Sequence, residues 1–135
     1  MKNKTKVLVT GACGVTSRSV VRSIMISDTF KDKCEFIGTD ICDLWYGVYE
    51  KLYKKVYRIP RYDEPQYRNM INSIIVDGKI YLAIIIPEPE VLYWSEYPFD
   101  INFMKIPPNF SRIVLSKKNL YEELKGTELT PKYQI

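Results

Sequence analysis

A glycine-containing turn near the amino terminus is the first feature of the sequence with chemical potential. Gly11, Ala12, Cys13 and Gly14 follow a short apolar run and precede a helical pattern. In dinucleotide-binding folds, glycines at such a turn allow a tight bend and expose backbone amides to a phosphate. Ser17 stands where the third glycine of that pattern would lie. The turn predicts a nucleotide-type fold. It leaves open whether the loop binds a ligand or only begins the domain.

Three carboxylates come at or just after the ends of predicted strands. Asp40 ends the run Glu35–Asp40, where a ribose-binding acid lies in dinucleotide-binding folds. Glu88 and Glu90 follow the longest apolar run of the chain. Because ligands of open α/β sheets bind at the carboxyl ends of the strands, all three are candidate binding residues. Carboxylates in the first turn of a helix also stabilise the helix by themselves, so this second interpretation of the glutamates stays open.

The residue types exclude several familiar chemistries. The sequence has no His, which removes His-based acid–base catalysis, Ser–His and Cys–His pairs and the usual zinc sites. Cys13, Cys34 and Cys42 lack Cys-x-x-Cys spacing, so we expect neither a disulfide framework nor a metal site. Cys13 lies near a predicted helix amino terminus, which lowers a thiol pKa, but without His we interpret it as a small buried residue.

A Tyr-x-x-x-Lys pair near the carboxyl terminus has the spacing that short-chain dehydrogenases use for proton transfer. Helical spacing places Tyr121 and Lys125 on one face. Too few residues follow Lys125 to complete a substrate pocket of that kind. We therefore expect no catalytic residue in this chain.

The composition is that of a globular protein with one core. The chain has 135 residues, 46% of them hydrophobic and 27% charged, and a net charge of +4. The basic stretch Lys51–Arg58 is interpreted as a solvated surface beside a strand, so a nucleic-acid partner is not expected. No signal peptide precedes the first predicted strand, and the apolar run Ile80–Ile86 is too short to span a bilayer. These features predict a cytoplasmic protein without a membrane partner.

The elements that must position the candidate residues alternate between strands and helices. Strands are predicted at Val7–Val9, Glu35–Asp40, Val56–Pro60 and Ile80–Ile86. Helices are predicted with the apolar stripes Val15, Val20, Val21, Ile24 and Met25, then Tyr67, Met70, Ile71, Ile74 and Ile75, and over Glu88–Trp94 and Lys117–Lys125. Right-handed crossovers then give an α/β fold: a Rossmann-like, open, mostly parallel sheet with helices on both faces. The continuous apolar character of Ile80–Ile86 predicts the central strand.

Several boundaries follow from local signals. Asp63 is expected to cap the second long helix and Gly78 to end it, while Ser116 caps the last helix. Ile101–Ile106 fits a further strand. Ser111–Leu115 fits either a strand or a helix.

Taken in order, these features resemble the N-terminal, pre-ATP-grasp domain of ATP-grasp ligases, particularly relatives of the carbamoyl-phosphate synthase large chain. The resemblance covers residues 6–131. It rests on Val7–Gly14, Ile37–Asp40, Val56–Pro60, Ile84–Glu90 and the stretch from Lys117 to Pro131. Ser116 replaces the aspartate that precedes the lysine in that family.

The resemblance implies a pre-ATP-grasp domain at 1–115 and a helix and tail at 116–135 that lead toward an ATP-grasp domain absent from this chain. It implies an enzyme that activates a carboxylate as an acyl phosphate and passes it to an amine, with ATP and magnesium bound by that absent part. None of the family's ATP- or magnesium-binding residues can be placed on this sequence. The expected partners are an ATP-grasp domain or subunit, a small-molecule substrate and a second copy of the chain. Its candidate residues for substrate or nucleotide are Gly11, Ala12, Cys13, Gly14, Asp40, Glu88 and Glu90.

Two other functions fit the same residues. One is a small NAD(P)-binding module related to epimerases and dehydrogenases, which the glycine turn and Asp40 support. Ser17 and the lack of a following substrate domain count against it. The other is a Rossmann-like interaction domain that binds no nucleotide.

Overall fold

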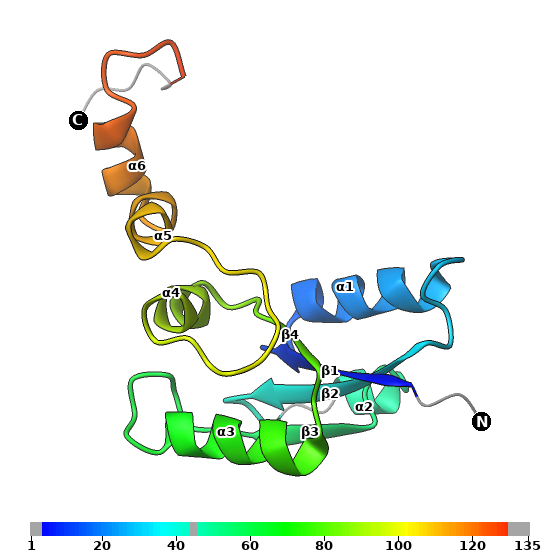
Figure 1. Ribbon diagram of the computed structural model, residues 1–135. Coiled ribbons are helices and arrows are strands. Elements are labelled where there is room, and N and C mark those ends of the chain that lie inside the picture. The colour runs from blue at the N-terminus through cyan, green and yellow to red at the C-terminus, as the bar shows by residue number, and fades with distance from the viewer. Residues whose placement is uncertain (1–3, 44–45, 130–135) are drawn as a thin grey trace.

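The computed structural model describes residues 4–43 and 46–129, in which strands alternate with helices until two further helices end the described chain (Figure 1). The strands are β1 (Thr5–Thr10), β2 (Cys34–Asp40), β3 (Lys55–Arg58) and β4 (Leu82–Ile84). The helices are α1 (Val15–Ile26), α2 (Tyr46–Tyr49), α3 (Tyr67–Gly78), α4 (Glu88–Glu96), α5 (Pro108–Val114) and α6 (Lys117–Glu123).

The four strands form one parallel sheet in the order β3-β2-β1-β4. β1 and β2 pair along their full common length, from Thr5 opposite Cys34 to Thr10 opposite Thr39. The chain steps outward from β1 to β3 and then returns to place β4 on the other side of β1. This confirms the predicted Rossmann-like α/β fold.

Each face of the sheet has its own hydrophobic core, because successive side chains of a strand point to opposite faces. Leu8 and Ile37 pack with α3, α4 and Phe99 on one face. Val9 and Phe36 pack with α1 and with the segment before β3 on the other. Figure 1 shows α1 and α3 on opposite sides of the strands, as predicted.

The prediction of a central strand at Ile80–Ile86 was wrong. β4 has three residues and lies at the edge of the sheet. Trp94 and Phe103 pack on the same core as Ala83, whereas Leu82, Ile84 and Ile85 are only partly buried and line a cavity at this edge. Of the seven residues in this run only Ile80 and Ala83 are buried, so the apolar character overstated both the burial of the segment and its position in the sheet.

The strand predicted at Ile101–Ile106 is reduced to a single parallel bridge between Asn102 and Leu82. The Ala83 amide donates to the Asn102 carbonyl (2.8 Å), and the Asn102 side chain donates to the Tyr81 carbonyl (3.0 Å). The Asn102 side chain thus satisfies one edge carbonyl that a longer strand would have paired.

The start of α3 also differs from the prediction. Asp63 does not cap the helix, because α3 begins only at Tyr67 and the Asp63 carboxylate accepts a hydrogen bond from Arg61 Nε (3.3 Å). Gly78 is the last residue of α3, as predicted, although the left-handed residue that follows is Lys79, with φ 51°.

Three residues assigned to apolar stripes are exposed rather than buried. Val15 and Met25 lie at or near the two ends of α1, and Met70 lies on α3. The middle of α1 supplies the buried contacts instead, through Ser17 and Val21.

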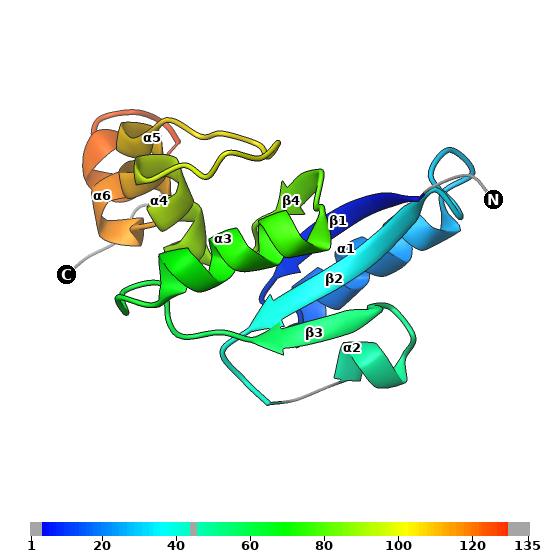
Figure 2. The same cartoon turned by 60° about the horizontal axis from the view of Figure 1, so that its bottom comes forward.

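The carboxyl-terminal part of the described chain is helical. Ser111–Leu115, which fitted either a strand or a helix, lies largely in α5. Ser116 caps α6 as predicted, because its side chain accepts a hydrogen bond from the Asn119 amide (3.3 Å). Both views place α5 and α6 away from the strands, with α5 against α4 (Figures 1 and 2). Pro131, the last marker of the resemblance, lies outside the described residues.

The longest described helices, α1 and α3, have 12 residues each, and none of the described helices could cross a membrane.

Candidate functional site

A cavity of about 250 Å³ opens at the carboxyl ends of β1 and β2, beside the start of α4. The strands point the same way in Figure 2, so their carboxyl ends meet at one edge. Strand order reverses between β1 and β4, and ligands of open α/β sheets bind outside the strand ends at such a switch point. The cavity is lined by Gly11, Asp40, Ile41, Ile59, Arg61, Tyr62, Pro87, Pro89 and Glu90.

Three of the predicted site residues line this cavity: Gly11, Asp40 and Glu90. The other four do not. Ala12 is buried in the core on the α1 side and Cys13 is half-buried against it, while Gly14 and Glu88 are exposed.

Sequence analysis did not identify Arg61 and Tyr62, which also line the cavity. They lie in the loop after β3, and that loop has no recognisable motif. Their position was still accessible to reasoning, because a loop after any parallel strand lies at the carboxyl edge of the sheet.

The amides of the glycine loop are used within the protein. Ala12 N donates to the Thr39 carbonyl (3.0 Å), Cys13 N to Asp40 Oδ2 (2.8 Å) and Gly14 N to the Gly11 carbonyl (2.9 Å). A phosphate-binding loop presents such amides to its ligand instead. In this protein they fasten the turn to the end of β2.

The open side of Gly11 is occupied by a proline. Gly11 has φ +60°, and a Cβ added there would lie 2.7 Å from Pro87 Cγ. The glycine is therefore required for the close approach of the β4–α4 connection. Ser17, in place of a third glycine, is buried and donates its hydroxyl to the Thr10 carbonyl (3.1 Å).

Asp40 is a structural link as well as a cavity residue. Its Oδ2 accepts from Cys13 N, and its Oδ1 accepts from Cys42 N (2.9 Å). In a dinucleotide-binding fold the corresponding acid accepts hydrogen bonds from ribose hydroxyls. Each Asp40 oxygen accepts one backbone amide here, which fixes the carboxylate to the turn and to the residues after β2.

The Cys13 thiol is held in its protonated form. Burial and the neighbouring Asp40 carboxylate raise the Cys13 pKa to about 12. A helix amino terminus can lower a thiol pKa, but here burial, with the Asp40 charge adding to it, raises the Cys13 pKa instead. Cys13 is therefore not set up as a nucleophile.

Glu90 is hydrogen-bonded by side chains from two other elements, α3 and β1. It lies in the first turn of α4 and is 7% exposed. Tyr67 donates its hydroxyl to Glu90 Oε1 (2.6 Å), and the Thr10 side chain forms a second hydrogen bond with the carboxylate. Burial raises the Glu90 pKa, the two hydrogen bonds oppose that change, and the charge of Asp40 adds to it.

No protein-family model matches this chain, and no curated protein matches it. Within residues 4–43 and 46–129, no group of three or more His, Cys, Asp or Glu side chains could hold a metal ion. The functional assignment therefore depends on the geometry of the site.

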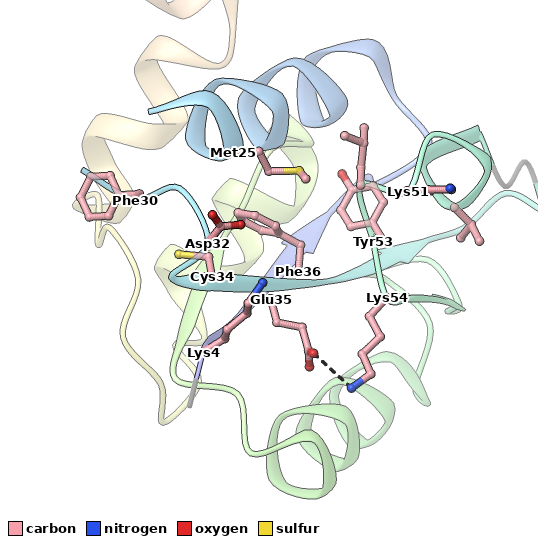
Figure 3. A pocket seen from close by; sticks show the side chains of 12 residues that line it. Lys4, Met25, Phe30, Asp32, Cys34, Glu35, Phe36, Lys51, Tyr53 and Lys54 are labelled. Atoms are coloured by element: carbon pink, nitrogen blue, oxygen red, sulfur yellow. Dashed lines mark hydrogen bonds and ion pairs between the residues drawn. The ribbon is translucent and has the colours of Figure 1, made fainter. Parts of the chain in front are cut away.

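A second cavity, of about 340 Å³, lies on the α1 side near the amino end of β2 (Figure 3). Lys4, Lys51 and Lys54 surround apolar side chains that include Phe36, and Lys54 pairs with Glu35 (3.1 Å). None of the predicted site residues lines it. The candidate functional site is therefore the cavity at the carboxyl edge.

Proposed function

We propose that this chain is the substrate-side domain of an ATP-dependent carboxylate–amine ligase of the ATP-grasp type. Its sequence resembles that domain in relatives of the carbamoyl-phosphate synthase large chain. In this proposal the cavity holds a small-molecule substrate. ATP and magnesium bind to a further domain or subunit, and this chain is not catalytic alone.

The observation that carries the proposal is the contrast between the glycine loop and the cavity beside it. Three successive loop amides, from Ala12 to Gly14, donate to groups of the protein, and Pro87 covers Gly11. In a dinucleotide-binding fold the glycines of this turn instead let the pyrophosphate approach the backbone at the start of the helix. The cavity at the switch point remains open, and its volume of about 250 Å³, just below the range of drug-sized ligand sites, limits it to a small substrate.

Titration of the full chain with NADH, NADPH and magnesium–ATP, followed by calorimetry, tests this proposal. We expect no binding of any of the three. NADH binding that is weakened by Asp40→Asn would favour the NAD(P)-binding module instead. ATP hydrolysis by the chain alone, abolished by Glu90→Ala, would overturn the non-catalytic role.

A positive test uses the partner. If an ATP-grasp reading frame adjoins the gene, its product should form ADP faster when this chain is added. Glu90→Gln should reduce that stimulation, and Glu88→Gln, the same charge change at an exposed position of α4, should not. A rate of ADP formation that is the same with and without the chain would contradict the proposal and favour the interaction-domain alternative.

A further inference from the structure

The cavity at the carboxyl edge combines apolar walls with buried carboxylates. Ile41, Ile59 and two prolines supply the apolar lining, while Asp40 and Glu90 line the same cavity and are both buried. A buried carboxylate costs free energy unless it is paired or hydrogen-bonded. The partners of Glu90 therefore determine what the cavity accepts.

The hydroxyl groups around Glu90 are oriented as donors toward it. Trp94 Nε1 donates to the Tyr67 hydroxyl oxygen (2.9 Å), which leaves the Tyr67 proton for Glu90 Oε1. In the same way the Ile86 amide donates to Thr10 Oγ1 (3.1 Å), and the Thr10 proton is available to Glu90. Both hydroxyls present a hydrogen to the carboxylate, so the surroundings favour Glu90 as an acceptor.

Glu90 retains acceptor capacity beyond these two bonds. A carboxylate has about four lone-pair positions, and two hydrogen bonds fill only part of them. Across the described residues, neither Glu90 nor Asp40 forms an ion pair. Arg61, the basic residue that lines the cavity, pairs with Asp63 (3.3 Å). A ligand that complements Glu90 brings hydrogen-bond donors, and a positively charged donor makes the strongest hydrogen bond to a carboxylate that has no ion-pair partner.

We propose that this cavity binds the protonated amino group of a small substrate, with Glu90 as its counter-ion and the isoleucine and proline side chains around its aliphatic part. An ammonium group has three donors and no acceptor, which matches the unfilled capacity of Glu90 and the nearby charge of Asp40. This inference rests on the proposed function and names the class of substrate.

The role of the bound nitrogen follows from its protonation. A carboxylate at hydrogen-bond distance favours the ammonium form, which has no lone pair for attack. The nitrogen held by Glu90 is therefore a recognition group and not the nucleophile of a ligase. The substrate class is an aminocarboxylate whose carboxylate, at the other end, is the group that is activated.

Three small probes of the same length test the assignment on the full chain at neutral pH: n-butylammonium, 1-butanol and butyrate. The readout is the indole Nε1–H resonance of Trp94, assigned with a Trp45→Phe variant, because that hydrogen begins the chain of bonds to Glu90. We expect a saturable shift with butylammonium, binding at least about tenfold weaker for butanol, and none for butyrate.

Two variants locate the site. Glu90→Gln should weaken butylammonium binding by about tenfold or more, while the matched Glu88→Gln should leave it unchanged. If Glu90→Gln fails to fold, Ile41→Trp provides the test, because Ile41 lines the cavity and is exposed, so that a larger side chain there narrows the cavity without replacing a core residue. It should block binding and preserve the fold.

Equal affinity for butylammonium and butanol, a preference for butyrate, no saturable shift with any probe, or unchanged affinity in both cavity variants would overturn the inference. These results differ from those that overturn the proposed function. Binding of NADH or ATP refutes the ligase-domain assignment even if butylammonium binds at Glu90. Stimulated ADP formation without butylammonium binding supports the ligase domain with another substrate class.

Discussion

Thr10 and Thr39 lie opposite each other in the β1–β2 pair, and both are fully buried. The Thr10 hydroxyl accepts from the Ile86 amide and bonds to Glu90, whereas Thr39 Oγ1 has no hydrogen-bond partner among the described residues. The Thr10 hydroxyl thus connects the sheet to the site. The Thr39 hydroxyl loses its hydrogen bonds to water on burial and gains none in the described protein, which costs free energy.

These two positions give a matched pair of substitutions. Thr10→Val should lower the free energy of unfolding by about 1–3 kcal/mol, because it leaves a buried amide and carboxylate short of a partner. Thr39→Val should leave that free energy unchanged or raise it by about 1 kcal/mol. Urea unfolding measures both, and equal losses at the two positions would contradict the assignment.

The raised pKa of Glu90 makes stability depend on pH. Burial is the largest cause, with Asp40 adding to it and Tyr67 and Thr10 opposing it. Between the ordinary value of 4.5 and the raised value, the folded chain binds more protons than the unfolded chain. The Glu90 contribution to stability is therefore greatest below that window and decreases as pH rises through it.

Urea unfolding as a function of pH isolates this contribution. The difference in unfolding free energy between the parent chain and Glu90→Gln should fall as pH rises through the window, because glutamine does not titrate. A difference that stays constant with pH, or that grows as pH rises, would refute the raised pKa.

The two glycines of the turn should respond differently to alanine. Gly11→Ala requires φ +60° and brings Cβ against Pro87, so we expect a loss of at least about 1–2 kcal/mol of unfolding free energy. Gly14 has φ −71° and ψ 153°, which any residue adopts, and an added Cβ would lie 3.1 Å from the Gly11 carbonyl oxygen, so Gly14→Ala should cost less than Gly11→Ala. Thermal unfolding followed by circular dichroism compares them, and a larger loss at Gly14 would be inconsistent with the turn described.

At the scale of elements, α6 depends on its cap more than on its packing. It has no buried residue, and Ser116 Oγ accepts from the Asn119 amide. Ser116→Ala should destabilise this helix by about 1 kcal/mol and leave the sheet intact. Amide hydrogen exchange should accelerate in α6 alone; faster exchange in β1 and β2 would show that α6 is coupled to the core.

Elements with strong local patterns were predictable from the sequence, and elements that depend on neighbours were not. β2 ends at Asp40 and α3 at Gly78, as apolar periodicity and turn residues indicated. The position of β4 was not predictable, because an apolar run does not reveal whether its strand lies inside the sheet or at the edge. Asp63 does not cap α3 because its carboxylate accepts a hydrogen bond from Arg61 in the preceding turn.

The site was predictable to the same partial extent. Gly11, Asp40 and Glu90 were predictable from their positions after strands, because the carboxyl ends of parallel strands lie at one edge of the sheet. All three line the cavity there. The bonds of Glu90 to Tyr67 and of Tyr67 to Trp94 were not predictable, since they depend on how α3 and α4 cross. The occupied loop amides were likewise set by tertiary contacts with β2.

For the whole molecule, the sheet separates two cores that serve different purposes. The core on the α1 side contains Ala12 and packs the glycine turn, while the core on the α3 side contains Tyr67 and Trp94, whose hydrogen bonds orient Glu90. The candidate site lies where the chain changes from one half of the sheet to the other. The partners implied by the resemblance, including a second copy, stay predictions.

The bond from the Ile86 amide to Thr10 spans 76 positions of the chain, so the site joins its earliest strand to a late segment. Closing so long a loop is entropically costly and comes late in folding relative to local contacts. The cavity is then among the last features to form, after the β1–α1–β2 unit. We expect Glu90→Gln to speed unfolding and to leave the refolding rate nearly unchanged, which stopped-flow kinetics in urea would measure. A slowed refolding rate would instead place Glu90 in the folding nucleus.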